Sequence, residues 1–440
     1  MSRIMQSNVL VIVIAGLLSS LMEQAHAIPA FARKYRTSCT TCHIAVPKRN
    51  AFGEAFRRNG YVMPEGDDLL IKQEPVSLGS EEWRELLPHA IPPGLLPAEF
   101  PLAAYAHQRF VAEFGEDKKG NQIEFDMPHE LEVFMGGTFG EQFSFFGEWI
   151  MFEKGKNAPG LKRFFFQLSD LVGPKNAFNI RLGRIEPAIT EGYVDNNRIT
   201  LEHAMTLDYK ATGKWRPRDQ QSGVEFRGIL NHRYQYALGV VNGEKKTIGD
   251  DTDEKDVYGR VAAKFGGLPL DGFQVEELTS LKELDNWADN SLTVGAYLYQ
   301  GNYVAPNEVD NDFNRFGADL HGNINRIDLF AGVIIGTDNN PDGLVDATAK
   351  EKELNSLAWF AEGQYLFFPW LICGVRVGGA SSDQNGATID NFTTVSPNIT
   401  ILARPNVRFT LEGLVKSGTA GGSEIKDALT WIKLNTMFVF

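Results

Sequence analysis

The sequence predicts an all-β fold class: a transmembrane antiparallel β-barrel of about 16 strands, preceded by a small N-terminal α-helical domain. Three observations predict it. Beyond residue 100, apolar and polar residues alternate in short segments with the period of two that strands have. Short turns and longer polar loops alternate between these segments, as in bacterial outer-membrane barrels. After the first 27 residues no apolar run could form a transmembrane helix, so a chain in a membrane must cross it as a barrel.

The first residues have the features of a cleavable export signal. Arg3 precedes an apolar stretch at 9–21, and Ala25-His26-Ala27 offers small residues for cleavage. The stretch is shorter than the roughly 20 residues that span a bilayer as a helix, which favours cleavage over a retained anchor. We expect localisation in the bacterial outer membrane.

Composition divides the chain into four regions. They are the signal (1–27), a basic N-terminal domain (28–78), a linker with four prolines (79–100) and the barrel (101–440). The net charge of −13 argues against nucleic acid as a partner. No nucleophile elbow or phosphate-binding glycine loop is present, so hydrolase and nucleotide-dependent chemistry have no support.

The sequence Cys39-Thr40-Thr41-Cys42-His43 is an attachment motif for one covalent haem c. The two thiols add to the two vinyl groups of haem, and His43 is then held where its imidazole can ligate the iron. A zinc site is the alternative, but no second Cys/His pair lies nearby. Cys373 stands alone, so no disulfide framework is expected.

A helix is expected directly after the motif, over residues 47–59. It has proline at its first position, Phe52, Ala55 and Phe56 on one face, and Gly60 as its stop. That face would cover one side of a porphyrin or form a small core. The two interpretations are compatible in a domain this short.

The sixth ligand of the iron stays open. Met63 lies just after the helix and is favoured, His89 is the alternative, and a ligand from the barrel or an open position are further options. Arg57 and Arg58 could pair with haem propionates, although a solvated basic face is slightly favoured.

Acidic tracts at 250–254 and 338–342 could collect cations such as ferrous iron. Ordinary solvated loops are the favoured interpretation, because carboxylates without fixed geometry do not define a site.

The strongest strand pattern covers residues 407–416, and the last ten residues alternate up to a terminal Phe440. A soluble sandwich would also alternate, but its size would be unusual. Seventeen segments resemble strands, whereas a bacterial barrel needs an even number, so 103–114 or 199–210 is expected not to be a strand.

The stretch 266–290 is too long for a short turn and resembles a helix near its middle. Short turns are expected at 231–232, 322–323, 368–369 and 404–405, and long loops at 242–255, 302–311, 337–354, 381–393 and 417–426.

Residues 28–33, the haem motif, Pro47, Phe52-Gly53 and Asn59-Gly60-Tyr61 together resemble the N-terminus of the outer-membrane monohaem cytochrome–porin fusions, whose best known member oxidises iron. The resemblance covers residues 28–64 closely and the barrel only in architecture; Arg49 and Asn50 depart from the pattern. Segments 223–228 and 234–243 resemble strands of phosphate-selective porins, but the acidic chain argues against that selectivity.

The resemblance implies electron transfer across the outer membrane, with Cys39 and Cys42 attaching the haem and His43 ligating it. The partners would be a periplasmic c-type cytochrome or other periplasmic carrier, extracellular iron or another external redox partner, and outer-membrane lipid. Whether the chain acts as an iron oxidase or reductase stays open. The alternative is a porin that conducts solutes and carries a haem-containing plug.

Overall fold

The computed structural model describes most of the chain from residue 30 onward. The described residues are 30–64, 66, 76–77, 95–96, 101–114, 122–140, 142–155, 159–190, 197–212, 215–243, 254–273, 287–345 and 348–440. The predicted export signal, His89 and the predicted helix within 266–290 lie outside these residues, as does the acidic tract 250–253. Of the predicted linker, only Leu95–Leu96 (β4) is described, where it pairs with Val76–Ser77 (β3).

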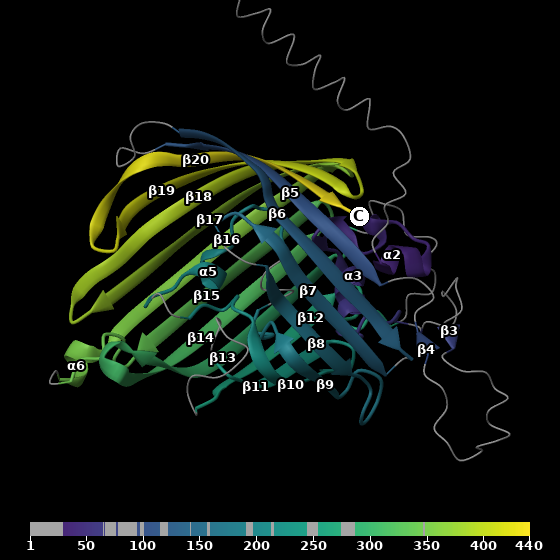
Figure 1. The fold of residues 1–440 in the computed structure, drawn as a ribbon, viewed down its shortest axis with the longest axis horizontal. Helices are drawn as coiled ribbons and strands as arrows, with labels where there is room; N and C mark the ends of the chain where they lie inside the picture. The colour runs from purple at the N-terminus through teal and green to yellow at the C-terminus, as the bar shows by residue number, and fades with distance from the viewer. Residues whose placement is uncertain are drawn as a thin grey trace, which may run out of the picture.

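The strands β5 to β20 form one closed antiparallel barrel of 16 strands (Figure 1). Strand β20 closes the barrel by pairing with β5, so that Trp431 lies opposite Glu113 and Val439 opposite Tyr105. The strand number is therefore as predicted. The strands are Leu102–Glu113 (β5), Gln122–Phe139 (β6), Phe143–Glu153 (β7), Gly160–Leu168 (β8), Asn179–Ile185 (β9), Gln221–Leu230 (β10), Tyr234–Val241 (β11), Asp256–Gly266 (β12), Ser291–Ala305 (β13), Val309–Ile324 (β14), Ile327–Asp338 (β15), Leu354–Phe368 (β16), Leu371–Gln384 (β17), Ala387–Arg404 (β18), Val407–Ala420 (β19) and Ser423–Val439 (β20).

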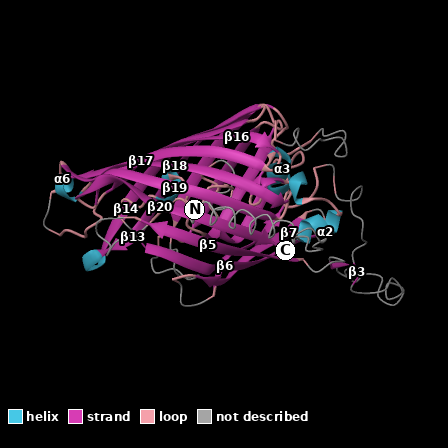
Figure 2. Cartoon of the chain, turned by 90° about the horizontal axis from the view of Figure 1, so that it is seen from above, coloured by secondary structure: helices cyan, strands magenta, loops and turns pink. Residues whose placement is uncertain are grey.

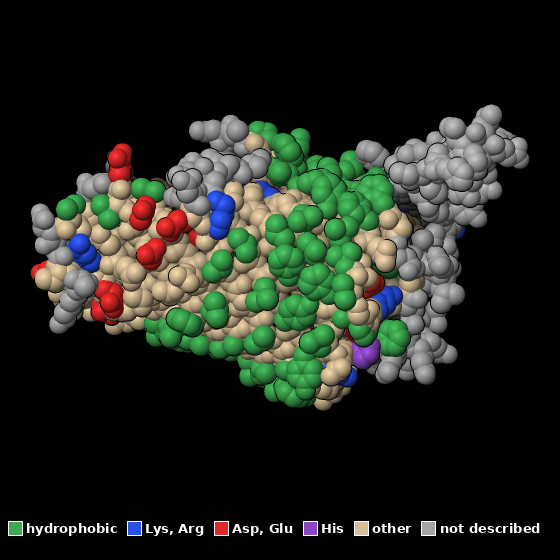
Figure 3. Space-filling view, turned by 90° about the horizontal axis from the view of Figure 1, so that it is seen from below, with side chains coloured by type: hydrophobic (Ala, Val, Ile, Leu, Met, Phe, Trp, Pro, Cys, Tyr) green, Lys and Arg blue, Asp and Glu red, His purple; other side chains and the backbone are tan. Residues whose placement is uncertain are grey.

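The barrel is polar inside and apolar outside. On β19, Arg408, Thr410 and Glu412 are buried in the interior, whereas Leu411 and Val415 are exposed on the outer surface. A soluble sandwich would bury the apolar set, so this orientation rules the sandwich out. Figure 3 shows hydrophobic side chains gathered over the middle of the barrel and acidic ones toward the end that carries Ala349–Lys352 (α6).

The two ends of the barrel differ in their connections. The end near Phe440 has two-residue turns at 325–326, 369–370 and 405–406. The opposite end carries the longer connections 242–255 and 339–353.

Three of the predicted long loops are wrong. Residues 302–311, 381–393 and 417–426 mostly continue their strands, which extend to tight hairpins at 306–308, 385–386 and 421–422. The predicted turn at 322–323 lies three residues later, at 325–326. The polar composition of these segments resembles a loop because a strand that extends beyond the bilayer has water on its outer face.

The segment 199–210 is the one that is not a strand, whereas 103–114 belongs to β5. It lies in the connection between β9 and β10 and contains the short helix Met205–Asp208 (α5). This connection enters the barrel: the Ile189 carbonyl accepts from Arg260 Nη1 (3.0 Å) on β12, and the Glu202 carbonyl accepts from Arg376 Nη1 (2.6 Å) on β17. It therefore crosses the interior from one wall to the other.

Residues 30–64, here called the N-terminal segment, form a small unit of short elements. These are Ala30–Tyr35 (α2), a 3₁₀ turn at Cys39–Thr41 (η1), the paired strands His43–Ala45 (β1) and Lys48–Arg49 (β2), and Ala51–Arg58 (α3). Both ribbon views place α2 and α3 at one end of the barrel, opposite α6 (Figures 1 and 2).

The predicted helix over 47–59 is shorter than expected. Helix α3 begins at Ala51 because the side-chain oxygen of Asn50 accepts from Gly53 N (2.8 Å) and caps it. Pro47 instead lies in the turn between β1 and β2. Gly60 ends the helix as predicted, with a φ of 72° that favours glycine.

None of the helices in the described part of the chain has the length and apolar character needed to cross a membrane.

Candidate functional site

The N-terminal segment is held inside the end of the barrel that has the short turns. Lys48 Nζ donates to Asp328 Oδ1 (3.0 Å) on β15 and to Gln364 Oε1 (2.7 Å) on β16. Asn59 Nδ2 donates to the carbonyl oxygen of Asp271 (2.9 Å), which belongs to the long connection between β12 and β13. That connection, unexplained by the sequence, therefore helps to fix the segment.

An apolar cavity lies between the segment and the barrel wall. It holds about 1270 Å³ of empty space, its open mouth included. Cys39, Cys42, His43 and Met63 all line it, so four of the five predicted haem-binding residues come together. Aromatic rings complete the walls, and Phe31, Phe56, Tyr61 and Phe146 contact one another there.

The backbone around the motif is fixed by α3. Asn50 Nδ2 donates to the carbonyl oxygen of Thr41 (3.0 Å), which ties the motif to the first turn of the helix. Gly53 faces the Cys42 carbonyl so closely that an added Cβ would lie 2.1 Å from that oxygen. The helix can therefore lie against the motif only with glycine at this position.

His43 is oriented by a carbonyl group. Its Nδ1 lies 3.2 Å from the carbonyl oxygen of Pro47. Because a carbonyl can only accept, Nδ1 carries the proton and Nε2 keeps its lone pair. Burial and the charge of Arg49 lower the pKa of His43 to about 4, so the ring is neutral at pH 7.

The two motif thiols are free and protonated. Cys39 and Cys42 do not form a disulfide. Burial, and secondarily the charge of Cys39, raise the pKa of Cys42 to about 12. Burial likewise raises the pKa of Cys39.

Three arginines of the segment, Arg49, Arg57 and Arg58, surround one buried acid, Glu54. Glu54 accepts from Arg57 Nη2 (2.7 Å) and Arg49 Nε (2.5 Å). Arg49 and Arg57 line the cavity, whereas Arg58 points to the Leu270 carbonyl (3.3 Å). The favoured solvated basic face is thus wrong, since Arg57 and Arg58 are about 5% exposed. Arg57 keeps a position beside the cavity, and Arg58 does not line it.

Three methionines line the cavity. Met63 comes from the N-terminal segment, and Met135 and Met437 come from β6 and β20 of the barrel wall. The two barrel methionines were not singled out from the sequence, because they are far from the motif along the chain and fall in ordinary strand patterns.

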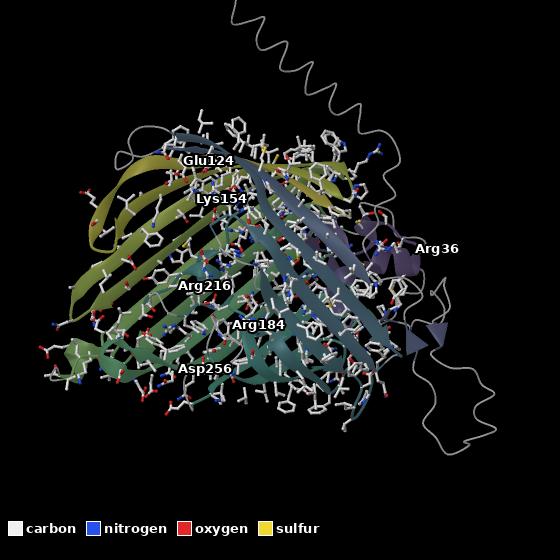
Figure 4. The ribbon with its side chains drawn as sticks, in the orientation of Figure 1. Arg36, Glu124, Lys154, Arg184, Arg216 and Asp256 are labelled. Carbon is white, nitrogen blue, oxygen red and sulfur yellow. The ribbon has the colours of Figure 1, made fainter. Side chains whose placement is uncertain are left out.

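A second, polar chamber adjoins the apolar cavity. It holds about 1300 Å³ of empty space, its open mouth included, and it shares Pro47, Tyr105 and Met437 with the apolar cavity. It extends to the connection between β9 and β10, where Arg216 lies, labelled near the middle of the barrel in Figure 4. Sequence analysis missed this chamber entirely.

The acidic tract 338–342 begins with a carboxylate that is already paired. Asp338 Oδ2 accepts from Arg315 Nη2 (2.7 Å), so its charge is compensated. The side chain of Asn340 makes two hydrogen bonds with the backbone of Leu344: Nδ2 donates to the carbonyl oxygen (3.1 Å), and Oδ1 accepts from the backbone N (3.0 Å). Among the described residues, no group of three or more His, Cys, Asp or Glu side chains could hold a metal ion.

No protein-family model matches the chain, and no curated protein matches it. Solved structures of porins do match. The anion-selective porin from Comamonas acidovorans has a TM-score of 0.54 at 14% identity, over 78% of this chain and 99% of the porin. The outer-membrane channel DcaP of Acinetobacter baumannii has a TM-score of 0.51 at 10% identity, over 77% and 96%. OmpF of Salmonella typhi, in complex with daunomycin, has a TM-score of 0.51 at 13% identity, over 77% and 97%.

The fold therefore defines a class: the chain is a porin-like outer-membrane β-barrel, and its location is the bacterial outer membrane. In such barrels the short turns face the periplasm. The N-terminal segment thus occupies the periplasmic mouth.

Proposed function

We propose that this protein transfers electrons across the bacterial outer membrane through one covalent haem c, held in the periplasmic mouth of a porin-like barrel. The observation that carries the proposal is the apolar cavity, which brings Cys39, Cys42 and His43 to one wall. The proposal agrees with the resemblance of residues 28–64 to the monohaem cytochrome–porin fusions.

The residues around the cavity fit a haem. Apolar and aromatic side chains offer a surface for a flat macrocycle, and Arg49 and Arg57 line the same cavity, where they suit propionates. The Pro47 carbonyl orients His43 with Nε2 left for iron, as histidine ligands of metals generally require. Cys39 and Cys42 would attach the group, and Met63 is the proposed sixth ligand.

A bound haem supplies a one-electron redox centre, and this chain's residues tune and shield it. The apolar belt of such a barrel is about 25 Å tall, too far for one centre at the periplasmic mouth to contact both sides. An extracellular partner, iron or another redox compound, must therefore enter the barrel. The periplasmic partner, a c-type cytochrome or another carrier, would dock at the mouth that holds the N-terminal segment.

The decisive experiment follows haem on the purified, detergent-solubilised protein. The Cys39→Ala/Cys42→Ala double variant is expected to lose all covalently bound haem, while Cys373→Ala on β17 keeps one haem per chain. A redox titration of the wild type, followed by addition of ferrous iron, then tests the direction of electron flow. Absence of stoichiometric haem in the wild type overturns the proposal.

A second function is favoured by the polar chamber: conduction of small solutes, with the N-terminal segment as a plug. Ion conductance of the reconstituted protein separates the two functions. Large open-channel currents, without electron transfer to an acceptor enclosed in vesicles, support transport. Small currents with reduction of that acceptor support electron transfer.

A further inference from the structure

The polar chamber carries an excess of positive charge. Among the described residues that line it, six are Lys or Arg and three are Glu. Two of the acids already have partners: Glu130 accepts from Tyr105 Oη (3.0 Å), and Glu202 pairs with Lys433 (2.5 Å). The acidic net charge of the whole chain therefore does not describe this chamber.

Some of the basic groups are neutralised by carboxylates behind them. Arg216 pairs with Asp208 and Asp219, and Lys162 pairs with Glu132 and Glu148. These six residues hold one part of the chamber in place without a net attraction for a ligand.

The lining at Arg408 and Arg109 is different, because buried donor atoms there make no hydrogen bond within the described part of the chain. Nε and Nη1 of Arg408, which is 4% exposed, make no hydrogen bond within the described part of the chain. The same holds for Nε of Arg109, which also lines the chamber. The side-chain amide of Asn435 is fully buried and has neither a donor nor an acceptor partner among the described residues, but Asn435 does not line the chamber. A buried donor left without a partner costs free energy, so such groups require a water, an ion or a ligand.

Strand register brings these donors together. Arg408 on β19 lies opposite Met437 on β20, which lies opposite His107 on β5. Two residues along, Asn435 of β20 lies opposite Arg109 of β5. The unpartnered donors thus belong to one patch on the inner wall of three adjacent strands.

We propose that this patch binds a small oxyanion or carboxylate in the polar chamber, between the interior of the barrel and the apolar cavity. The two guanidinium groups offer several N–H donors, and guanidinium matches planar carboxylate and phosphate oxygens in geometry as well as in charge. The shared walls at Pro47, Tyr105 and Met437 place such an anion next to the apolar cavity. Binding rests on the barrel wall and does not depend on the haem.

Equilibrium dialysis of labelled inorganic phosphate against the full-length, detergent-purified protein tests the proposal. Saturable binding of one phosphate per chain is expected. Added salt should weaken this binding, and citrate should displace the phosphate if the site also takes carboxylates. Arg408→Gln should weaken binding at least about tenfold. Arg404→Gln is the matched control, because Arg404 is exposed at the end of β18 and the change in charge is the same. Its affinity should equal that of the wild type.

Arg109→Gln is a second test variant, which is used if Arg408→Gln fails to assemble. Heat-dependent gel mobility reports whether the barrel of each protein has assembled. The Cys39→Ala/Cys42→Ala protein should bind phosphate as the wild type does, which separates this inference from the proposed function. Phosphate binding that is unsaturable, or that is equal in the wild type and the Arg408 and Arg109 variants, overturns the proposal and leaves water as the occupant.

Discussion

The Nδ1 atom of His43 lies 3.2 Å from the carbonyl oxygen of Pro47. The turn between β1 and β2 places this carbonyl, and Asn50, directly after β2, links Thr41 of the motif to helix α3. One short stretch of chain thus sets both the tautomer of the histidine and the position of the helix that closes the cavity. The proposed ligand geometry therefore depends on residues 38–53 acting together.

The identity of the sixth ligand gives the first prediction. Met63→Ala should lower the midpoint potential by on the order of 0.1 V, within the ~0.8 V range that axial ligands control, and should change the visible spectrum. Met135→Ala and Met437→Ala serve as matched controls, because both side chains line the same cavity from the barrel wall. An unchanged spectrum in Met63→Ala excludes this ligand, and a change in either control assigns it to the barrel.

Gly53 gives the second prediction. An alanine here would place Cβ 2.1 Å from the Cys42 carbonyl oxygen, so α3 must move away from the motif. Gly53→Ala should destabilise the N-terminal segment by about 1–3 kcal/mol and reduce covalent haem per chain by half or more. Gly160→Ala in β8 is the control, since no atom lies within 4 Å of its added Cβ. Equal haem content in the two variants would contradict the predicted contact.

The sequence predicted the barrel well because the relevant signal is local. Alternation with period two reports which face of a strand meets lipid, and on β19 the interior and exterior residues follow it. Strand ends were predicted less well. Ser382 and Asp390 pair across β17 and β18 within a stretch whose composition resembles a loop. Whether these residues form a strand or a loop depends on backbone pairing with the neighbouring strand, which composition does not report.

The candidate site likewise has one part that the sequence could predict and one part that it could not. Cys39, Cys42, His43 and Met63 lie within 25 residues of one another, so a motif could find them. The polar chamber joins Arg109 to Arg408, about 300 residues apart, through the closure of β20 on β5. No pattern in the sequence reports that closure, and each arginine taken alone resembles an ordinary polar position of a strand.

Lys48 gives the third prediction, which concerns how the N-terminal segment is held. Lys48 and Asp328 are both less than 10% exposed, so Lys48→Met leaves a buried carboxylate without its main partner. The contact should weaken by about 3 kcal/mol, and residues 30–64 should be cleaved faster by added protease. Lys34→Met is the control, because Lys34 Nζ donates to the neutral Thr138 hydroxyl (3.1 Å) in the barrel wall, and the change in charge is the same. Asp328→Asn in the Lys48→Met background should restore part of the resistance.

Glu54 gives the last prediction, a dependence on pH. Burial raises the pKa of Glu54, but Arg49, Arg57 and Arg58 lower it more, so the pKa lies well below its usual range. A depressed pKa stabilises the folded segment above the unfolded value of about 4.3, and this stability is lost as the pH falls through the folded value. Glu54→Gln should therefore destabilise the segment by about 3 kcal/mol at pH 7 and flatten its acid response.

Hydrogen exchange of residues 30–64 between pH 7 and pH 3 measures this effect. The wild type should lose protection as the pH falls below about 4, whereas Glu54→Gln should start low and change little. Glu351→Gln is the control, because Glu351 is exposed on α6 at the opposite end of the barrel. Parallel curves for the wild type and Glu54→Gln would show that the buried arginines do not depend on this carboxylate.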